Sequence, residues 1–154
     1  MAYLLAIFLL QILAGNPEKS TDDIVQLKAP EITVSSGKNG VIQIYVTVKS
    51  DYHIQANKVK DEFIIPTTLD ITTGEIITID KQLFPAARKF RLEGTKDHLL
   101  VYDGNFKIEI PFRTNEKVVR GNYQLNAKLH YQACNNKRCL PPRTIDFSIS
   151  LNVK

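Results

Sequence analysis

The sequence predicts an all-β protein that folds as an immunoglobulin-like β-sandwich in a single domain. Four long segments alternate apolar and polar residues with a period of two, which is the pattern of half-buried strands. Turn signals such as SGKNG, TTGE, YDGN and RGN separate the segments, and no amphipathic helix is evident. About seven to nine short strands of this kind are typical of a two-layer sandwich.

Each long segment places every second residue on the face that we expect to line the core. These inward residues are Ile42, Ile44, Val46 and Val48, then Phe106, Ile108, Ile110 and Phe112, then Tyr123, Leu125, Ala127, Leu129 and Tyr131, and finally Ile145, Phe147, Ile149, Leu151 and Val153. Shorter strands are predicted at Ile32–Ser35, Thr68–Thr72, Ile76–Asp80 and Lys89–Leu92.

The first fifteen residues, MAYLLAIFLLQILAG, carry no charge and differ from the rest of the chain. The run is too short for a membrane-spanning helix, which needs about 20 apolar residues. Its length and its final small residues are typical of a signal peptide, although no Lys or Arg precedes the run. We therefore expect a signal peptide at 1–15, a polar lead-in at 16–30 and a domain at 31–154, exported and without a membrane span in the mature chain.

Composition argues against several classes of function. The formal net charge is +4, but acidic and basic residues are interspersed and no basic stripe carries stacking aromatics, so we expect no nucleic-acid partner. The chain has no G-x-S-x-G elbow and no glycine-rich phosphate loop, which argues against a hydrolase or a nucleotide enzyme. We expect no cofactor.

The two cysteines, Cys134 and Cys139, lie between the last two long strands and are separated by four residues. This places them near the mouth of a hairpin, where facing strands bring Cβ atoms within bonding range. A ring this small stabilises a fold by only about 2 kcal/mol, less than a long-range bridge does. His130 and the two cysteines do not have the spacing of a zinc site, so we expect no metal.

The residues around the cysteines leave two interpretations open. Lys137, Arg138 and Arg143 bring positive charge, which favours thiolate over thiol, and Pro141 and Pro142 stiffen the exit of the loop. These features favour a reactive pair. Two cysteines in an exported domain are nevertheless more often a passive structural bridge.

The segment YQACNNKRCLPP resembles the N-terminal, extracytoplasmic domain of the thiol:disulfide interchange protein DsbD family. That family carries Tyr-Gln-x-Cys, a short polar loop and Cys-x-Pro-Pro between its last long strands. The matching residues are Tyr131, Gln132, Cys134, Cys139, Pro141 and Pro142. The segments DYHIQANKVKDEFIIPTTLDI and KFRLEG with LLVYDGNFKIEIPF are also similar to family members, so the resemblance covers about residues 31–153.

The resemblance implies an immunoglobulin-like periplasmic domain that passes reducing equivalents by thiol–disulfide exchange, as a component of a protein-disulfide reductase. It implies that Cys139 forms the mixed disulfide and that Cys134 resolves it. The implied partners are a DsbD-type membrane electron donor and thioredoxin-fold periplasmic proteins, and we expect a monomer. The surrounding site candidates are Tyr131, Gln132, Lys137, Arg138, Pro141, Tyr52, His53 and Asn57.

The chain departs from the family pattern in several places. Its intercysteine loop of four residues is one shorter than in the best-known members, and His53 and Gln55 occupy positions where the family has aromatic residues. The expected cap loop, residues 92–100, contains no Phe or Tyr, which leaves two alternatives: Leu99 or Leu100 shields the disulfide, or the shield is absent. The 154 residues include no electron conduit, so we do not expect this chain alone to draw electrons across a membrane. The alternative is a non-catalytic immunoglobulin-like binding module with a structural hairpin disulfide.

Overall fold

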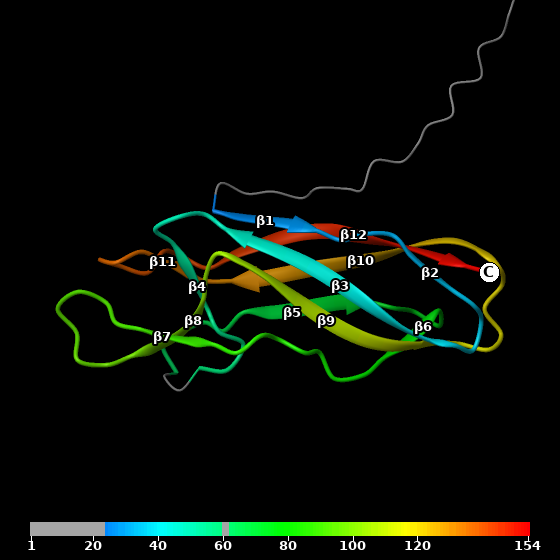
Figure 1. The fold of residues 1–154 in the computed structure, drawn as a ribbon, viewed down its shortest axis with the longest axis horizontal. Helices are drawn as coiled ribbons and strands as arrows, with labels where there is room; N and C mark the ends of the chain where they lie inside the picture. Colours follow the sequence, from blue (N-terminus) through cyan, green and yellow to red (C-terminus); the bar gives the residue numbers. More distant parts are fainter. Residues whose placement is uncertain (1–23, 60–61) are drawn as a thin grey trace, which may run out of the picture.

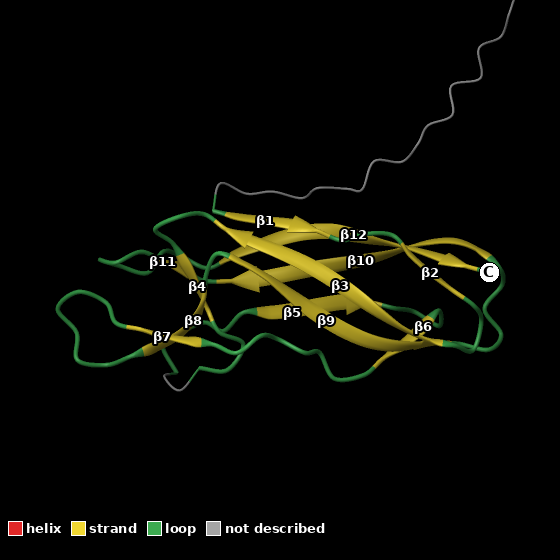
Figure 2. Cartoon of the chain, in the orientation of Figure 1, coloured by secondary structure: helices red, strands yellow, loops and turns green. Residues whose placement is uncertain are grey.

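The structure is a computed structural model that describes residues 24–59 and 62–154. Within these ranges the chain forms strands and loops and no helix (Figure 2), which confirms the all-β prediction. No membrane-crossing helix is found in this part of the chain. The predicted signal peptide at 1–15 and the first part of the predicted lead-in, 16–23, lie outside the described residues.

Two of the sheets form the sandwich (Figure 1). The first has four antiparallel strands, in the order β1 (Val25–Lys28), β3 (Asn39–Val48), β9 (Asn105–Thr114) and β6 (Ile77–Ile79). The second has the order β2 (Ile32–Val34), β12 (Arg143–Val153), β10 (Gly121–Tyr131) and β5 (Thr68–Thr72). In the second sheet β2 runs parallel to β12, whereas β10 is antiparallel to both of its neighbours.

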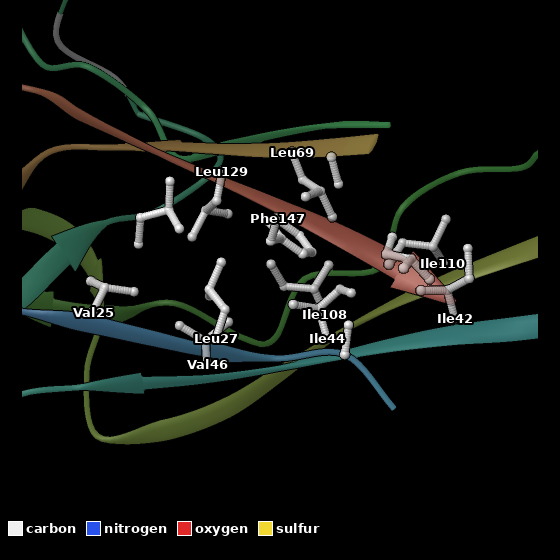
Figure 3. Packing of buried hydrophobic residues seen from close by; sticks show 14 of the residues in the cluster. Val25, Leu27, Ile42, Ile44, Val46, Leu69, Ile108, Ile110, Leu129 and Phe147 are labelled. Atoms are coloured by element: carbon white, nitrogen blue, oxygen red, sulfur yellow. The ribbon is translucent and has the colours of Figure 1, made fainter. Parts of the chain in front are cut away.

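The core lies between these two sheets, as the alternating pattern predicts. Ile42 and Ile44 of β3 are fully buried (Figure 3), and so are Ile149 and Leu151 of β12. All the predicted inward residues of the four long strands are buried except Phe106 and Tyr123, which are partly buried at strand ends. Each fully buried aliphatic side chain contributes about 2 kcal/mol. One such residue therefore matches the whole contribution expected from the small disulfide ring.

The predicted lead-in at 16–30 is wrong in its last part, because β1 lies within it. Val25 and Leu27 are buried and point into the core, and they pair in register with Val48 and Val46 of β3. The strand has only four residues and follows a polar stretch, so its alternation is too short to stand out. The folded domain therefore begins before residue 31.

A third sheet lies at one end of the sandwich (Figure 1). Its order is β11 (Ala133–Cys134), β4 (His53–Gln55), β8 (Leu99–Tyr102) and β7 (Arg88–Phe90). Of these strands, the sequence predicted β7 only, and placed it slightly late at Lys89–Leu92. The described residues hold twelve strands, more than predicted, because this end is built from strands of two to four residues.

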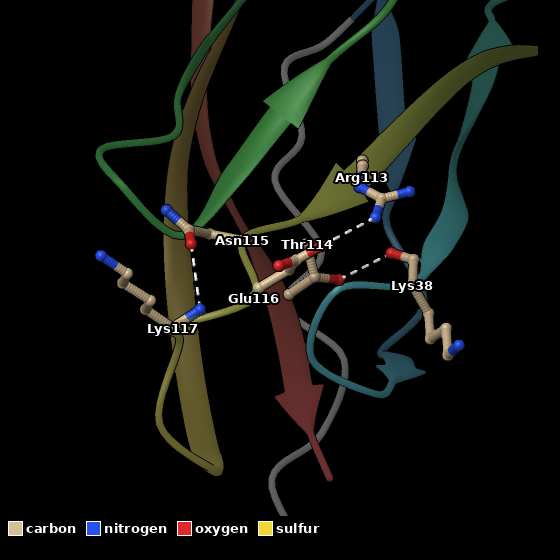
Figure 4. A network of polar contacts seen from close by, with 6 residues as sticks. All are labelled: Lys38, Arg113, Thr114, Asn115, Glu116 and Lys117. Carbon is tan, nitrogen blue, oxygen red and sulfur yellow. Dashed lines mark hydrogen bonds and ion pairs between the residues drawn. The ribbon is translucent and has the colours of Figure 1, made fainter.

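The opposite end is closed by the turn that leads from β9 to β10 (Figure 4). Thr114 is fully buried, and both its backbone N–H and its Oγ1 donate to the carbonyl of Lys38, at 2.9 and 3.0 Å. Asn115 Oδ1 accepts the N–H of Lys117 at 3.0 Å. The two bonds to the carbonyl of Lys38 satisfy the buried donors of Thr114. Both cysteines lie at the other end, beside the third sheet.

Candidate functional site

The cysteines lie at the tip of a long hairpin. Strands β10 and β12 pair in register up to Tyr131 and Arg143, and the chain then enters the short strand β11, where Cys134 pairs with His53 of β4. Cys134 and Cys139 form a disulfide with their Cα atoms 3.9 Å apart. The placement at the mouth of the last hairpin agrees with the sequence.

The residues between the cysteines form a tight turn that Asn135 holds together. Its Oδ1 accepts the backbone N–H groups of Lys137 at 2.9 Å and of Arg138 at 3.0 Å, and its own N–H donates to the carbonyl of Arg138. Asn commonly closes turns in this way, because its side chain mimics a backbone acceptor. The side chains of Lys137 and Arg138 are exposed. Their positive charges therefore act from the solvent side of the turn.

The two sulfur-bearing residues differ in exposure. Cys134 is fully buried, at 0% exposed, whereas Cys139 is only partly buried. Disulfide exchange requires a thiolate to approach one sulfur directly. The geometry therefore makes the Cys139 side of the bond the accessible one.

Gln55 contacts both sulfurs, and it was not among the site candidates taken from the sequence. Its Nε2 lies 3.0 Å from Sγ of Cys134 and 3.6 Å from Sγ of Cys139. Its backbone N–H donates to the carbonyl of Gln132 at 3.0 Å, and its carbonyl accepts the hydroxyl of Thr67. The residue is fully buried, and its Oε1 has no hydrogen-bond partner among the described residues.

His53 lies on the same face of β4 as Gln55 and opposite Cys134. Its ring packs against Phe90 of β7, and its Nε2 is buried with no partner in the described part of the chain. Burial, together with the guanidinium of Arg88, lowers the pKa of His53 to about 4, although Asp103 partly offsets these two effects. His53 is therefore a neutral imidazole at pH 7.

Gln132 connects the cysteine hairpin to a neighbouring loop. Its Nε2 donates to the carbonyl of Leu140 at 3.2 Å, and its Oε1 accepts the N–H of Ile65 at 3.1 Å. The loop presents exposed apolar side chains, since Phe63 is 82% exposed and Ile65 is 40% exposed. Pro141 is exposed at the exit of the same hairpin. The accessible cysteine thus lies beside an apolar surface.

The loop between β7 and β8 touches the cysteine hairpin through its backbone. The N–H of Glu93 donates to the carbonyl of Asn136 at 3.0 Å. Leu99 and Leu100, the residues expected to shield the disulfide, belong to β8 and line a groove of about 440 Å³ that reaches Gln55. The other residues of this groove are Val59, Ile64, Lys89, Asp97 and His98.

The remaining candidates lie at varying distance from the sulfurs. Tyr131 is fully buried directly before the cysteine turn. Tyr52 packs against the hydrophobic core, and Asn57 Oδ1 accepts the hydroxyl of Tyr102 at 2.6 Å. These contacts of Tyr52 and Asn57 are not made with the cysteines. His130 Nε2 lies 3.1 Å from Oδ2 of Asp70, and its Nδ1 lies 2.7 Å from Oγ1 of Thr144. Within 24–59 and 62–154, no group of three His, Cys, Asp or Glu residues is placed to hold a metal ion.

Residues 21–151 match the family model of the thiol:disulfide interchange protein DsbD, N-terminal. The fold is similar to that of the N-terminal periplasmic domain of ScsB from Proteus mirabilis, with a TM-score of 0.58 and 18% identity over 88% of this chain. The match covers 50% of that chain, so the protein spans about half of its length. The N-terminal domain of Neisseria meningitidis DsbD in the reduced form has a TM-score of 0.46 and 14% identity, over 76% of this chain and 82% of that one. No curated protein sequence matches the chain.

Proposed function

Because this chain belongs to the family of the N-terminal domain of the thiol:disulfide interchange protein DsbD, we propose that it is an exported thiol–disulfide exchange module. It passes reducing equivalents between a membrane reductase and thioredoxin-fold proteins of the periplasm, through Cys134 and Cys139. The family and the disulfide support the general role in exchange. The partners, the periplasmic location and the roles of the residues are our proposal, as is a monomeric domain that follows a cleaved signal peptide.

The observation that carries the proposal is the unequal burial of the two cysteines. A thiolate of the reduced donor attacks Sγ of the accessible Cys139 and forms a mixed disulfide. The Cys134–Cys139 bond breaks, and its electron pair leaves on Sγ of Cys134 as a thiolate. The second thiolate of the donor then attacks the donor's own sulfur in the mixed disulfide. Cys139 departs as a thiolate, the donor is oxidised to a disulfide, and this chain holds the reduced pair.

Delivery runs through the same atoms in the opposite direction. The Cys139 thiol loses its proton, and the thiolate that forms attacks the disulfide of an oxidised thioredoxin-fold protein, one sulfur of which leaves as a thiolate. Cys134 then attacks Sγ of Cys139, which restores the intramolecular disulfide and releases the partner as a dithiol. Cys134 resolves efficiently because the tight Asn135 turn holds it next to Cys139.

The surface around Cys139 supports a protein partner rather than a small molecule. Phe63 and Ile65 expose apolar side chains on the loop that Gln132 ties to the cysteine hairpin. Apolar and aromatic residues of this kind are enriched at the centres of protein interfaces. A thioredoxin-fold protein that brings its own cysteine to Cys139 would cover this loop.

The reduction potential of the Cys134–Cys139 pair tests the proposal, measured against glutathione or dithiothreitol. We expect a potential above about −300 mV, and exchange with an oxidised thioredoxin-fold protein, because structural disulfides usually lie below that value. A lower potential without exchange would show a structural hairpin disulfide. The chain would then be a non-catalytic binding module.

A further inference from the structure

The side-chain amide of Gln55 is only half used in the oxidised state. Nε2 donates toward both sulfurs, while Oε1 is buried without a partner in the part of the chain that the structure describes. A buried polar atom without a hydrogen bond is costly, and native proteins keep few of them. The arrangement therefore needs a reason beyond packing.

Reduction of the disulfide supplies a hydrogen-bond donor for Oε1 of Gln55. A disulfide sulfur has no hydrogen to donate, so Oε1 has nothing to accept from the oxidised pair. When two electrons and one proton are added, the pair becomes one thiolate and one thiol, which are one acceptor and one donor. A carboxamide carries the matching donor and acceptor on a single group.

We propose that Gln55 stabilises the reduced pair, with its Nε2–H donating to the thiolate of Cys134 and its Oε1 accepting the S–H of the thiol. The inference rests on the proposed exchange function and adds a residue to it. During exchange Gln55 acts on the leaving group, because the bond to Cys139 breaks with its electron pair on Cys134. Gln55 thereby lowers the barrier to opening the disulfide and raises the fraction of chain that is reduced at equilibrium.

The distances assign the thiolate to Cys134, and two further features explain why a thiolate there needs the amide. The amide nitrogen is nearer to Sγ of Cys134, at 3.0 Å, than to Sγ of Cys139, at 3.6 Å. Cys134 is shielded from water, so a charge on it depends on donors from the protein. The cations that the sequence suggested for this task, on Lys137 and Arg138, are exposed on the turn. Salt screens exposed charges, whereas a buried amide dipole is screened much less.

The replacement Gln55→Met tests this role, because it keeps the length of the side chain and removes both polar functions. In a Cys139→Ser background we expect about tenfold less Cys134 thiolate at a given pH below the thiol pKa, at low and at high salt alike. The readout is the ultraviolet absorbance of the thiolate as the pH is raised. The matched control is Gln82→Met, since Gln82 Nε2 donates to the carbonyl of Leu69 at 2.8 Å, away from both sulfurs. It should leave the titration curve of the parent unchanged.

A wild-type measurement keeps the test independent of how well the variant folds. We expect the side-chain amide resonances of Gln55 to shift between the oxidised and reduced chain, and to titrate together with the thiol. The inference is overturned if these resonances do not respond, or if Gln55→Met and Gln82→Met give the same thiolate titration. Failure of the wild-type chain to exchange with glutathione or a thioredoxin-fold protein would overturn the proposed function instead. The two failures are therefore distinguishable.

Discussion

The imidazole of His53 packs against the ring of Phe90, with the ring centroids 3.8 Å apart and the planes tilted by 40°. The contact joins two strands that are not neighbours, because β8 lies between β4 and β7 in the third sheet. Cys134 is the cross-strand partner of His53. His53 therefore links β7 to the short strand that carries the inner cysteine.

His53 should make the stability of the domain depend on pH. Its pKa is about 4 in the folded chain and about 6.5 in the unfolded chain, so the unfolded state binds a proton that the folded state refuses. Stability is complete above about pH 6.5 and falls as the pH drops toward 4, by about 3 kcal/mol at most. Urea unfolding of the wild type and of His53→Gln checks this. The variant should lack this component, and parallel stability curves for the two proteins would contradict the prediction.

Replacing the cysteines singly should give opposite trapping behaviour. Cys134→Ser removes the resolving thiol, so Cys139 should form a mixed disulfide with an oxidised thioredoxin-fold partner and retain it. Cys139→Ser leaves only the buried Cys134, which we expect to react at least tenfold more slowly, in proportion to its poorer access. Non-reducing electrophoresis after mixing with the partner shows the trapped species. Equal trapping by both variants would reverse the assignment of roles.

The strands that the sequence predicts most clearly are those long enough to show their period. Strands β3, β9, β10 and β12 each have ten or eleven residues, so the alternation of buried and exposed side chains is unmistakable. The strands β1, β4, β8 and β11 have two to four residues. In β4 all three residues are buried, which erases the alternation altogether. Short pieces of this kind form because the long strands already hold their ends together.

The residues of the site likewise differ in how well the sequence predicts them. The cysteines, the hairpin and the turn are local in sequence, and they could be predicted from spacing and charge. Gln55 lies 79 residues from Cys134, and only the pairing of β4 with β11 brings them together. Asn57 is a close neighbour of Gln55 in the sequence, but it binds Tyr102. Proximity of this kind is a property of the fold, which a single sequence does not display.

Opening the disulfide should cost little stability. The closed ring spans a separation of five residues, and the chain-entropy estimate for so small a loop is about 2 kcal/mol. We expect the reduced chain to stay folded and to unfold at a denaturant concentration lowered accordingly. Urea titrations with and without dithiothreitol measure the difference. Complete unfolding on reduction would instead identify the disulfide as a structural element.

Gly40 should not tolerate a side chain, because it faces the ring of Phe112 across the β3–β9 pair. A Cβ at this position would lie 2.5 Å from Cζ of Phe112, and that ring is buried in the core. We expect Gly40→Ala to lower the free energy of unfolding by about 1–3 kcal/mol, as overpacked cores do. Chemical denaturation measures this loss. In a Phe112→Leu background the added cost should shrink, and an unchanged cost would rule out the ring contact as its cause.

We expect the side chain of Phe63 to speed disulfide exchange with partner proteins but not with small reductants. Its side chain is 82% exposed on the loop that Gln132 holds beside the cysteine hairpin. We expect Phe63→Ala to slow exchange with a thioredoxin-fold protein by about threefold to tenfold, since exposed aromatics often anchor interfaces. The rate with glutathione, which needs no such surface, should be unchanged. Val119→Ala is the matched control, because Val119 is 74% exposed on the turn between β9 and β10. This turn lies at the opposite end of the sandwich (Figure 1). Equal rates for Phe63→Ala and the wild type with the protein partner would exclude this loop from the docking surface.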